Sequence, residues 1–345
     1  MPLHHVDAAP NPTLIPLNLA GLRRGLARLF ALVAISILLF TGCKRTETTD
    51  NGGIEKNSSD LMLVRNPLPP NQKKIWNEFD GSNTLVEANT LAAYGPRPSG
   101  SETNIQVRVH LTERLKQLGW QTTEQRFSEH SPDGKLIEFC NLSARFDKSP
   151  LSSKRILIGA HFDTTPTREF RAIGATDGAA NSAILVELAR VLAGDPTLAA
   201  QVELLFLDGD APFNELNLSD GLFGSRFYVQ MLRIHEHAED VRAAILLRNT
   251  GSGVLNYAPN GDKALIDQLK LAAHVAGFSL EPANRLLLAD QTPFLQAGIP
   301  SVALLEADSP ILNTADDTAQ RLNIDSLAKT GKMILYFVAA TTTPG

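Results

Sequence analysis

Four short, nearly uninterrupted apolar runs constrain the fold of this chain more than any other feature. They occupy Arg155–Ala160, Val202–Leu207, Ala243–Leu247 and Ser301–Leu305. Strands of this composition are typical of a parallel sheet that is covered on both faces. Helical patterns lie between the runs, at Ala179–Leu192 and Ala264–Ala276. The sequence therefore predicts a single α/β domain with a mostly parallel central sheet and helices on both faces.

Further elements are predicted ahead of these runs. Gln121–Phe127 and Leu136–Phe146 have the composition of strands and lie on either side of the turn Ser131–Gly134. Asn83–Tyr94 has a helical pattern, and a second helix is expected to end at Gly119. The alternation of helices and strands thus extends over most of the chain.

The composition excludes several classes of protein and of site. With 43% hydrophobic and 20% charged residues, the chain is neither disordered, nor collagen-like, nor a coiled coil. Lys and Arg number 32 against 37 Asp and Glu, a net charge of −5 without a basic block, so we expect no nucleic-acid partner. The two cysteines, Cys43 and Cys140, are too few for a disulfide framework or a cysteine zinc site.

The first 43 residues have the pattern of an export signal. Three arginines precede the 12-residue apolar run Leu29–Phe40, which is too short to span a bilayer. Leu39–Cys43 resembles the bacterial lipobox, in which the cysteine receives lipid after cleavage. We expect residues 1–42 to be a lipoprotein-type signal peptide; the alternative is an uncleaved membrane anchor. Both place the protein in the bacterial cell envelope, facing the periplasm or the exterior and held to the lipid bilayer, in the first case through acylated Cys43.

A linker is expected between the lipidated cysteine and the folded domain. Lys44–Asn71 is rich in Thr, Ser, Asn, Gly and Pro and shows neither helical nor strand periodicity. We therefore predict a flexible tether over residues 43–80 and a folded domain over residues 81–345.

Polar residues follow the predicted strands. They are His161 and Asp163 after the first apolar run, Asp208 and Asp210 after the second, and Arg248 after the third, while Asp177 comes just before a helix. Each alone has an ordinary explanation, such as a helix cap or a turn. Ligands of open α/β sheets bind outside the carboxyl ends of the strands. The shared placement therefore predicts that these residues converge on one crevice.

These residues lie in motifs that resemble the zinc-dependent aminopeptidase superfamily and, within it, the glutaminyl cyclase branch. In order, the motifs are Gly95–Gly100, Asn141–Leu142, Gly159–Thr164, Gly174–Gly178, Phe206–Asp210, Gly221–Arg226, Asp290–Leu295, Ala297–Pro300 and Asn313–Thr318. They extend over about Asn83 to Ala340. The resemblance implies the fold of that family and a zinc-dependent aminopeptidase or glutaminyl-peptide cyclotransferase ancestry.

The resemblance also assigns roles to individual positions. In that family, the residue at His161 is a metal ligand, and the residue at Asp177 is a ligand that bridges when two metals are present. The position of Asp210 holds the general base. Asp290 matches an aspartate that the cyclases hold near this base. The resemblance therefore makes Asp210 and Asp290 the candidate catalytic residues, and His161 and Asp177 the remaining metal positions.

Three positions depart from the family's ligand pattern. Where the family has a second glutamate, an aspartate and a histidine, this chain has Ala211, Arg248 and Asn313. A catalytic zinc takes three N, O or S ligands and keeps one open position. Alanine has no donor atom, and a neutral amide is a poor zinc ligand. We therefore expect no metal cofactor; zinc would bind only if other residues, such as His235, His237 or His274, completed the site.

Arg248 stands out because of its charge. Without a divalent cation, Asp177, Asp210 and Asp290 would repel one another by about 4 kcal/mol per pair at ~4 Å and an effective dielectric constant near 20. An arginine offsets this repulsion and cannot lose its charge by titration. We therefore predict that Arg248 takes the charge position of the lost metal. The alternative is that its side chain extends along the sheet edge into solvent.

The last predictions concern the residues of the pocket and the function of the protein. We expect Asp163, Arg248 and Leu312 to line the pocket. Leu312 stands where the cyclases have a tryptophan of their aromatic wall, which argues against cyclisation of N-terminal glutamine. Three functions remain open: a catalytically impaired protein that binds peptide N-termini or another small polar ligand, an active aminopeptidase or cyclotransferase with substitute ligands, and a non-catalytic scaffold of the envelope.

Overall fold

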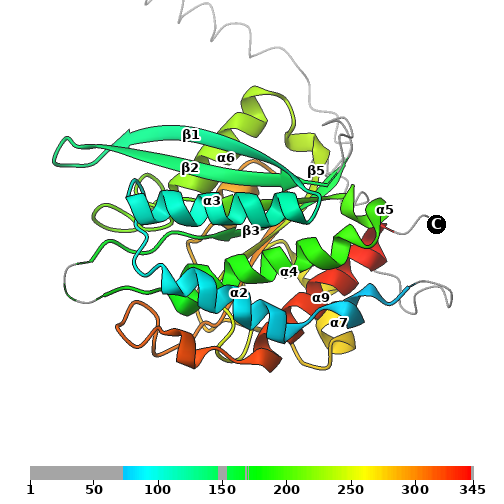
Figure 1. The fold of residues 1–345 in the computed structure, drawn as a ribbon. Helices are drawn as coiled ribbons and strands as arrows, with labels where there is room; N and C mark the ends of the chain where they lie inside the picture. The colour runs from blue at the N-terminus through cyan, green and yellow to red at the C-terminus, as the bar shows by residue number, and fades with distance from the viewer. Residues whose placement is uncertain (1–72, 147–153, 168, 170, 343–345) are drawn as a thin grey trace, which may run out of the picture. The chain divides into compact units, whose positions relative to one another are not determined.

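The protein forms one eight-stranded sheet with helices on both sides (Figure 1). The computed structural model describes residues 73–146, 154–167, 169 and 171–342. The strands are β1 (Gln121–His130), β2 (Leu136–Arg145), β3 (Arg155–His161), β4 (Val202–Leu207), β5 (Val241–Arg248), β6 (Asn256–Tyr257), β7 (Glu281–Pro282) and β8 (Ser301–Leu305). The helices are α2 (Gly81–Ala93), α3 (Glu102–Gln117), α4 (Asn181–Ala193), α5 (Pro196–Ala199), α6 (Phe223–Ile234), α7 (Lys263–Val275), α8 (Gln291–Gln296) and α9 (Ile324–Thr342).

The centre of the sheet is parallel. The strand order is β1-β2-β4-β3-β5-β8-β6-β7, and β4, β3, β5 and β8 run in the same direction. The hairpin of β1 and β2 joins β4 in antiparallel orientation, and β6 is antiparallel to β8. These four parallel strands are the four apolar runs of the sequence, so the predicted fold class is confirmed.

Helices cover both faces because successive residues of a buried strand point to opposite sides. On one face, Ile158 belongs to the large core shared with α2, α3, α4, α7 and α9. On the other face, Leu157 packs in a second core with Val229 of α6 and Phe294 of α8. Figure 1 shows α2, α3, α4, α7 and α9 in front of the sheet and α6 behind the β1–β2 hairpin. Both layers were predicted.

The folded region begins earlier than residue 81, where the sequence placed the domain boundary. Ile75, Trp76 and Phe79 are 1%, 7% and 3% exposed and belong to the main core. The Trp76 ring lies edge-on to Tyr336 of α9 at 4.9 Å between centroids. The apolar side chains of this short 3₁₀ segment cover α9, so the predicted tether is wrong at its C-terminal end. The signal segment, Cys43 and the tether up to residue 72 lie outside the described residues.

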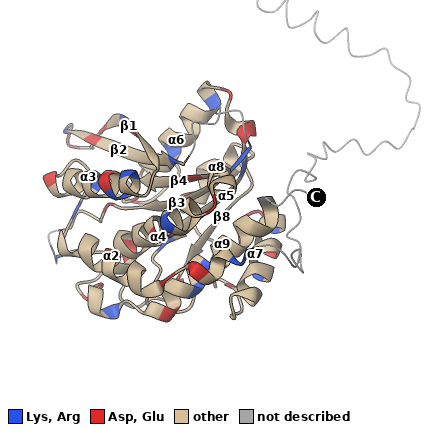
Figure 2. Cartoon of the chain, turned by 45° about the vertical axis from the view of Figure 1, so that its right-hand side comes forward, with Lys and Arg blue, Asp and Glu red and all other residues tan. Residues whose placement is uncertain are grey.

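Three other features of the described ranges bear on the predictions. No helix in them is long and apolar enough to cross a membrane. Figure 2 shows basic and acidic residues interspersed along the helices. Trp76 and Trp120, 7% and 2% exposed, are both core residues.

Candidate functional site

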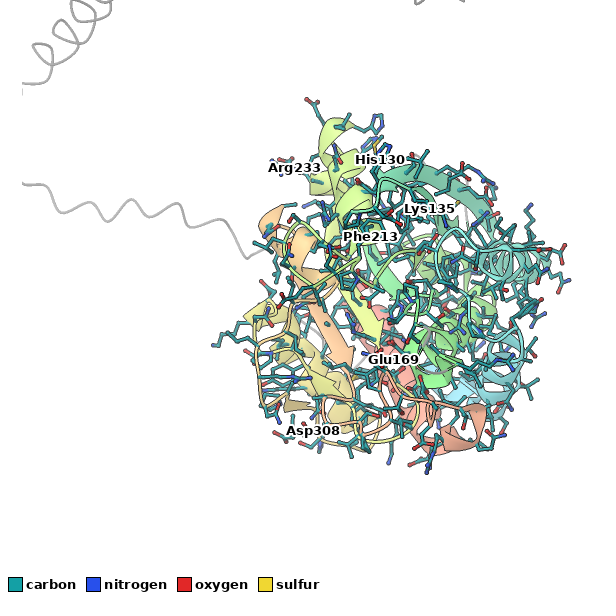
Figure 3. All side chains as sticks on the ribbon, turned by 90° about the vertical axis from the view of Figure 1, so that its left-hand side faces the viewer. His130, Lys135, Glu169, Phe213, Arg233 and Asp308 are labelled. Carbon is teal, nitrogen blue, oxygen red and sulfur yellow. The ribbon has the colours of Figure 1, made fainter. Side chains whose placement is uncertain are left out.

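Six polar residues that the sequence singled out meet at the carboxyl ends of the central strands. His161 ends β3 and Arg248 ends β5, and both side chains face a group of four aspartates from the surrounding loops. The aspartates are Asp163 after β3, Asp177 before α4, Asp210 after β4 and Asp290 before α8. All but Arg248 are at most 6% exposed. Figure 3 views this end of the sheet, with Glu169 and Phe213 labelled on the loops that follow β3 and β4.

His161 lies between two of these carboxylates. Its Nε2 is 3.0 Å from Asp177 Oδ1, and its Nδ1 is 3.4 Å from Asp163 Oδ1. Burial alone would lower the pKa of the His161 imidazole, but the charges of Asp210 and Asp177 raise it well above its ordinary value. Burial raises the pKa of Asp177, but His161 and the more distant arginines outweigh this and bring it to about 2. Each group thus favours the charged form of the other.

Arg248 forms an ion pair with Asp210. Arg248 Nη1 donates to Asp210 Oδ1 at 2.7 Å, and the arginine side chain is only 18% exposed. Burial lowers the pKa of the Arg248 guanidinium, but Asp210, Asp177 and Asp290 together raise it above its ordinary value. The guanidinium thus points into the cluster and not along the sheet edge into solvent. The position of the metal in relatives is not part of this structure, so its replacement by Arg248 stays a prediction.

The two candidate catalytic aspartates have raised pKa values. Burial raises the pKa of Asp210 to about 6, although Arg248 and His161 lower it. Burial likewise raises the pKa of Asp290, against the lowering effects of His161 and a hydrogen bond from Ser225. Asp210 is also linked to Asp163, because its backbone N–H donates to the Asp163 carboxylate at 3.2 Å. These carboxyl groups therefore form one electrostatic unit with His161 and Arg248.

A tight turn carries Asp177, and Asp317 holds that turn. The turn Ala175–Ala180 has a non-helical kink at Asp177 and Gly178. Asp317 accepts from the backbone N–H of Thr176 at 2.7 Å and from that of Asp177 at 3.2 Å. No role was predicted for Asp317, although it lies in the motif that contains Asn313. Its involvement arises from a contact across 140 residues.

Asp208 is separate from the site, although it lies two residues from Asp210. Its carboxylate accepts from the Ser99 hydroxyl at 2.7 Å, the Asn104 amide at 3.1 Å and the Cys140 N–H at 2.9 Å. Burial and the nearby Asp163 raise the pKa of Asp208 to about 7. Asp208 thus joins α3 and β2 to the end of β4, and the direction of its side chain marks it as structural.

Two departures from the ligand pattern adjoin Asp210, because Ala211 follows it in the chain and Arg248 pairs with it, and the third is Asn313. Asn313 and Asp177 line one small pocket together with Asp317, and the Asn313 amide oxygen accepts from the Thr165 hydroxyl at 3.4 Å. Ala211 begins the loop after Asp210 and is partly buried. Leu312 precedes Asn313 and is also partly buried. Arg248 is thus the only charged side chain among the three substitutions.

The histidines that could have supplied a substitute ligand lie elsewhere. His235 and His237 precede β5, whereas the site lies where β5 ends, and His237 pairs with Asp240 at 2.9 Å. His274 lines a separate pocket on α7 together with Lys270 and Phe278. Within the part of the chain that the structure describes, no three His, Cys, Asp or Glu side chains are arranged to hold a metal ion.

Known proteins resemble this chain in sequence and in fold. The chain is 27% identical over 316 residues to a glutaminyl-peptide cyclotransferase-like protein of Mus musculus, covering 82% of this chain and 79% of that protein. A glutaminyl cyclase of Fimbriiglobus ruber superposes with a TM-score of 0.68 at 23% identity, covering 76% and 95% of the two chains. A Bacteroides thetaiotaomicron glutaminyl cyclase bound to N-acetylhistamine gives 0.67 at 19% identity, covering 77% and 99%. The sequence model of peptidase family M28 matches residues 141–338, more than half of the chain, which confirms the resemblance drawn from the motifs: the chain belongs to peptidase family M28.

Proposed function

We propose that this glutaminyl-cyclase-like member of family M28 is an exported lipoprotein that binds peptide N-termini or another small polar ligand without metal-dependent catalysis. The observation that carries the proposal is the 2.7 Å ion pair between Arg248 and Asp210. It places a permanent positive charge within the group of carboxylates from which the family draws its metal ligands.

The residues present do not fit a zinc ion. Zinc requires three N, O or S donors in tetrahedral arrangement. Ala211 offers no donor, and the two remaining ligand positions contact each other, with His161 Nε2 3.0 Å from Asp177 Oδ1. A zinc ion beside Asp210 would lie close to the Arg248 guanidinium, which donates to Asp210 at 2.7 Å.

The cationic side chains of the cluster offset the repulsion between its carboxylates. Two close carboxylates repel by about 4 kcal/mol at ~4 Å and an effective dielectric constant near 20. His161 and Arg248 each contribute one positive charge that offsets this repulsion, and burial raises the pKa of Asp210 and Asp290 so that they share protons more readily. Without an activated water or a polarised carbonyl, a lone carboxyl such as Asp210 has little catalytic power.

The lining of the crevice favours a polar ligand. Carboxylates, the partly exposed Arg248 guanidinium and the Thr165 and Asn313 side chains offer both donors and acceptors. The cyclase relatives are named for acting on glutaminyl peptides, and one was crystallised with N-acetylhistamine, a small polar molecule. Peptide N-termini and comparable amides are therefore the first ligands to test.

The proposed location rests on the first 43 residues. The arginines, the apolar run and Cys43 support export followed by lipidation. Cys43→Ser should move the protein from the membrane fraction to the soluble fraction, while a Cys140→Ser control should stay with the membrane. Equal partitioning of the two variants would contradict the lipid anchor.

Metal content and turnover test the function. The full chain, purified in detergent without chelator and then dialysed, should contain well under one zinc per chain and should not convert an N-terminal glutamine peptide into its pyroglutamyl form with release of ammonia. The variant Ala211→Glu/Arg248→Asp/Asn313→His, which restores the family's ligand types, should retain zinc under the same conditions. Stoichiometric zinc in the wild type, or turnover abolished by a chelator, would support the active enzyme instead.

A further inference from the structure

Arg97 is a fully buried arginine behind the site whose side chain contacts only backbone carbonyl groups. The residue is 0% exposed. Its Nε donates to Phe162 O at 2.6 Å, Nη1 to Ile173 O at 2.6 Å and Gly95 O at 3.3 Å, and Nη2 to Gly174 O at 2.7 Å and Asp177 O at 3.4 Å. A guanidinium has five N–H donors, so these five bonds use all of them.

The carbonyl groups belong to the two segments that carry His161 and Asp177. Phe162 lies between His161 and Asp163, while Ile173, Gly174 and Asp177 belong to the loop and turn before α4. The Arg97 backbone is fixed to the first segment as well, because its N–H donates to the Thr164 hydroxyl at 2.9 Å. Arg97 therefore ties the segment of His161 to the turn of Asp177.

The close approach of this guanidinium requires glycine in the turn. A Cβ atom at Gly178 would lie 2.7 Å from Arg97 Nη2, whereas one at Gly174 would lie 2.5 Å from Asp177 O within the turn itself. Both glycines also have positive φ angles, +111° and +58°. The turn is thus shaped around the arginine side chain.

We propose that Arg97 is the positioning residue of the site, holding Asp177 against His161 through the backbone carbonyl groups of both segments. Asp317 accepts hydrogen bonds from N–H groups of the same turn. The Arg97 cation therefore binds carbonyl groups of the turn, and the Asp317 anion binds its N–H groups. The geometry of the Asp177 carboxylate is then set by protein side chains and does not need a metal ion. This role is independent of the proposed binding function.

The electrostatics of the site are consistent with this role. Burial lowers the pKa of Arg97 to about 10, against the opposing charges of Asp163, Asp177 and Asp317. The guanidinium therefore remains charged at neutral pH. Lysine at this position would keep the charge but has three donors on a single nitrogen, which cannot reach carbonyl groups on both segments.

Arg97→Lys in the full chain tests the proposal by hydrogen exchange and NMR. We expect the backbone amides of residues 175–179 to exchange about tenfold faster or more than in the wild type, because the turn opens locally. We also expect the ¹H resonance of the His161 Nε2 proton to shift or broaden, because Asp177 moves away from it. Arg155→Lys is the matched control: Arg155 is 2% exposed and lies at the opposite end of β3, so both signals should stay as in the wild type.

Two outcomes would overturn the role of Arg97. One is a folded Arg97→Lys protein whose 175–179 amides and His161 resonance match the wild type. The other is an equal response of these signals to Arg155→Lys, which would indicate general destabilisation. If Arg97→Lys does not fold, ¹⁵N-arginine labelling of the wild type decides: the Arg97 Nε–H should exchange at least tenfold slower than that of the partly exposed Arg248, and equal rates would contradict the proposal.

Discussion

Two buried ionic clusters lie at opposite ends of the same strands, and their compositions differ. At the amino ends of β3 and β4, Arg155 Nε is 2.5 Å from Glu203 Oε2, and the Tyr228 hydroxyl donates to Glu203 Oε1 at 2.9 Å. This cluster, the Arg155 cluster, contains one cation and one anion. The site at the carboxyl ends holds four aspartates against His161 and Arg248.

The comparison shows which cluster is purely structural. The Arg155 cluster is balanced in charge and completed by a phenol, so every group has a partner inside the fold. The site has more acidic than basic side chains in contact, and its only partly exposed charged side chain, Arg248, faces the crevice. An excess of buried carboxyl groups is costly for stability alone. In the site, the Arg248 guanidinium and His161 offset part of this excess negative charge.

The largest expected effect concerns the Arg155 cluster. Arg155→Met should lower the free energy of unfolding by about 4 kcal/mol, because Glu203 would be left buried without its cation. Urea unfolding of the full chain measures this. Arg155→Met/Glu203→Gln should recover a large part of the loss, and a double variant no more stable than the single one would show that the pair is not the source of the effect.

A smaller loss is expected at the site. Arg248→Met should lower the free energy of unfolding by about 2 kcal/mol, since a buried ion pair is broken but Asp210 can take up a proton more easily than an exposed carboxyl. Asp210→Asn in the same background should restore most of the stability. If Arg248→Met costs as much as Arg155→Met, the two clusters are alike and the contrast drawn between them is wrong.

Removal of the Tyr228 hydroxyl tests the Arg155 cluster with a smaller expected effect on stability. Tyr228→Phe removes one hydrogen bond to a charged group and should cost about 1.5 kcal/mol. The measurement is again urea unfolding, with Tyr257→Phe as a control on another tyrosine of the core. A loss of unfolding free energy smaller than that of Tyr257→Phe would show that the Tyr228 hydroxyl does not stabilise the Arg155 cluster.

The last expected effect is a pH dependence of stability, to which Asp210 contributes in addition to Asp208 outside the site. An unfolded aspartate has a pKa of about 3.9, whereas burial raises that of Asp210 to about 6. The folded protein therefore binds more protons between these values, and the contribution of Asp210 to stability falls as the pH rises from about 4 to about 6. Asp210→Asn should flatten the stability curve in this window, whereas Tyr228→Phe should leave its slope unchanged.

Several elements were predictable from the sequence because their patterns are local. Val202–Leu207 and Ser301–Leu305 are strands over the predicted residues, since uninterrupted apolar runs suit buried parallel strands. Helix α6, in contrast, was not predicted, although Phe223 and Val229 pack inside. Its first residues follow a loop without a capping side chain, so the sequence lacks a start signal.

The N-terminal boundary of the domain also could not be predicted from local sequence patterns. Trp76 and Phe79 lie in a short segment without periodicity, and nothing local distinguishes them from the tether. Their burial depends on α9, which is more than 240 residues later in the chain. Only the folded arrangement shows that these aromatic side chains belong to the core.

For the site, local sequence patterns were enough to identify the polar residues that end the strands. His161, Asp177, Asp210 and Arg248 were identified in this way, because strand ends and motif positions are local. The tertiary structure decided that Arg248 pairs with Asp210 and that Asp208 does not belong to the site. It alone also revealed Arg97, since hydrogen bonds to backbone carbonyl groups leave no pattern of side chains, and contacts between distant segments exist only after the chain has folded.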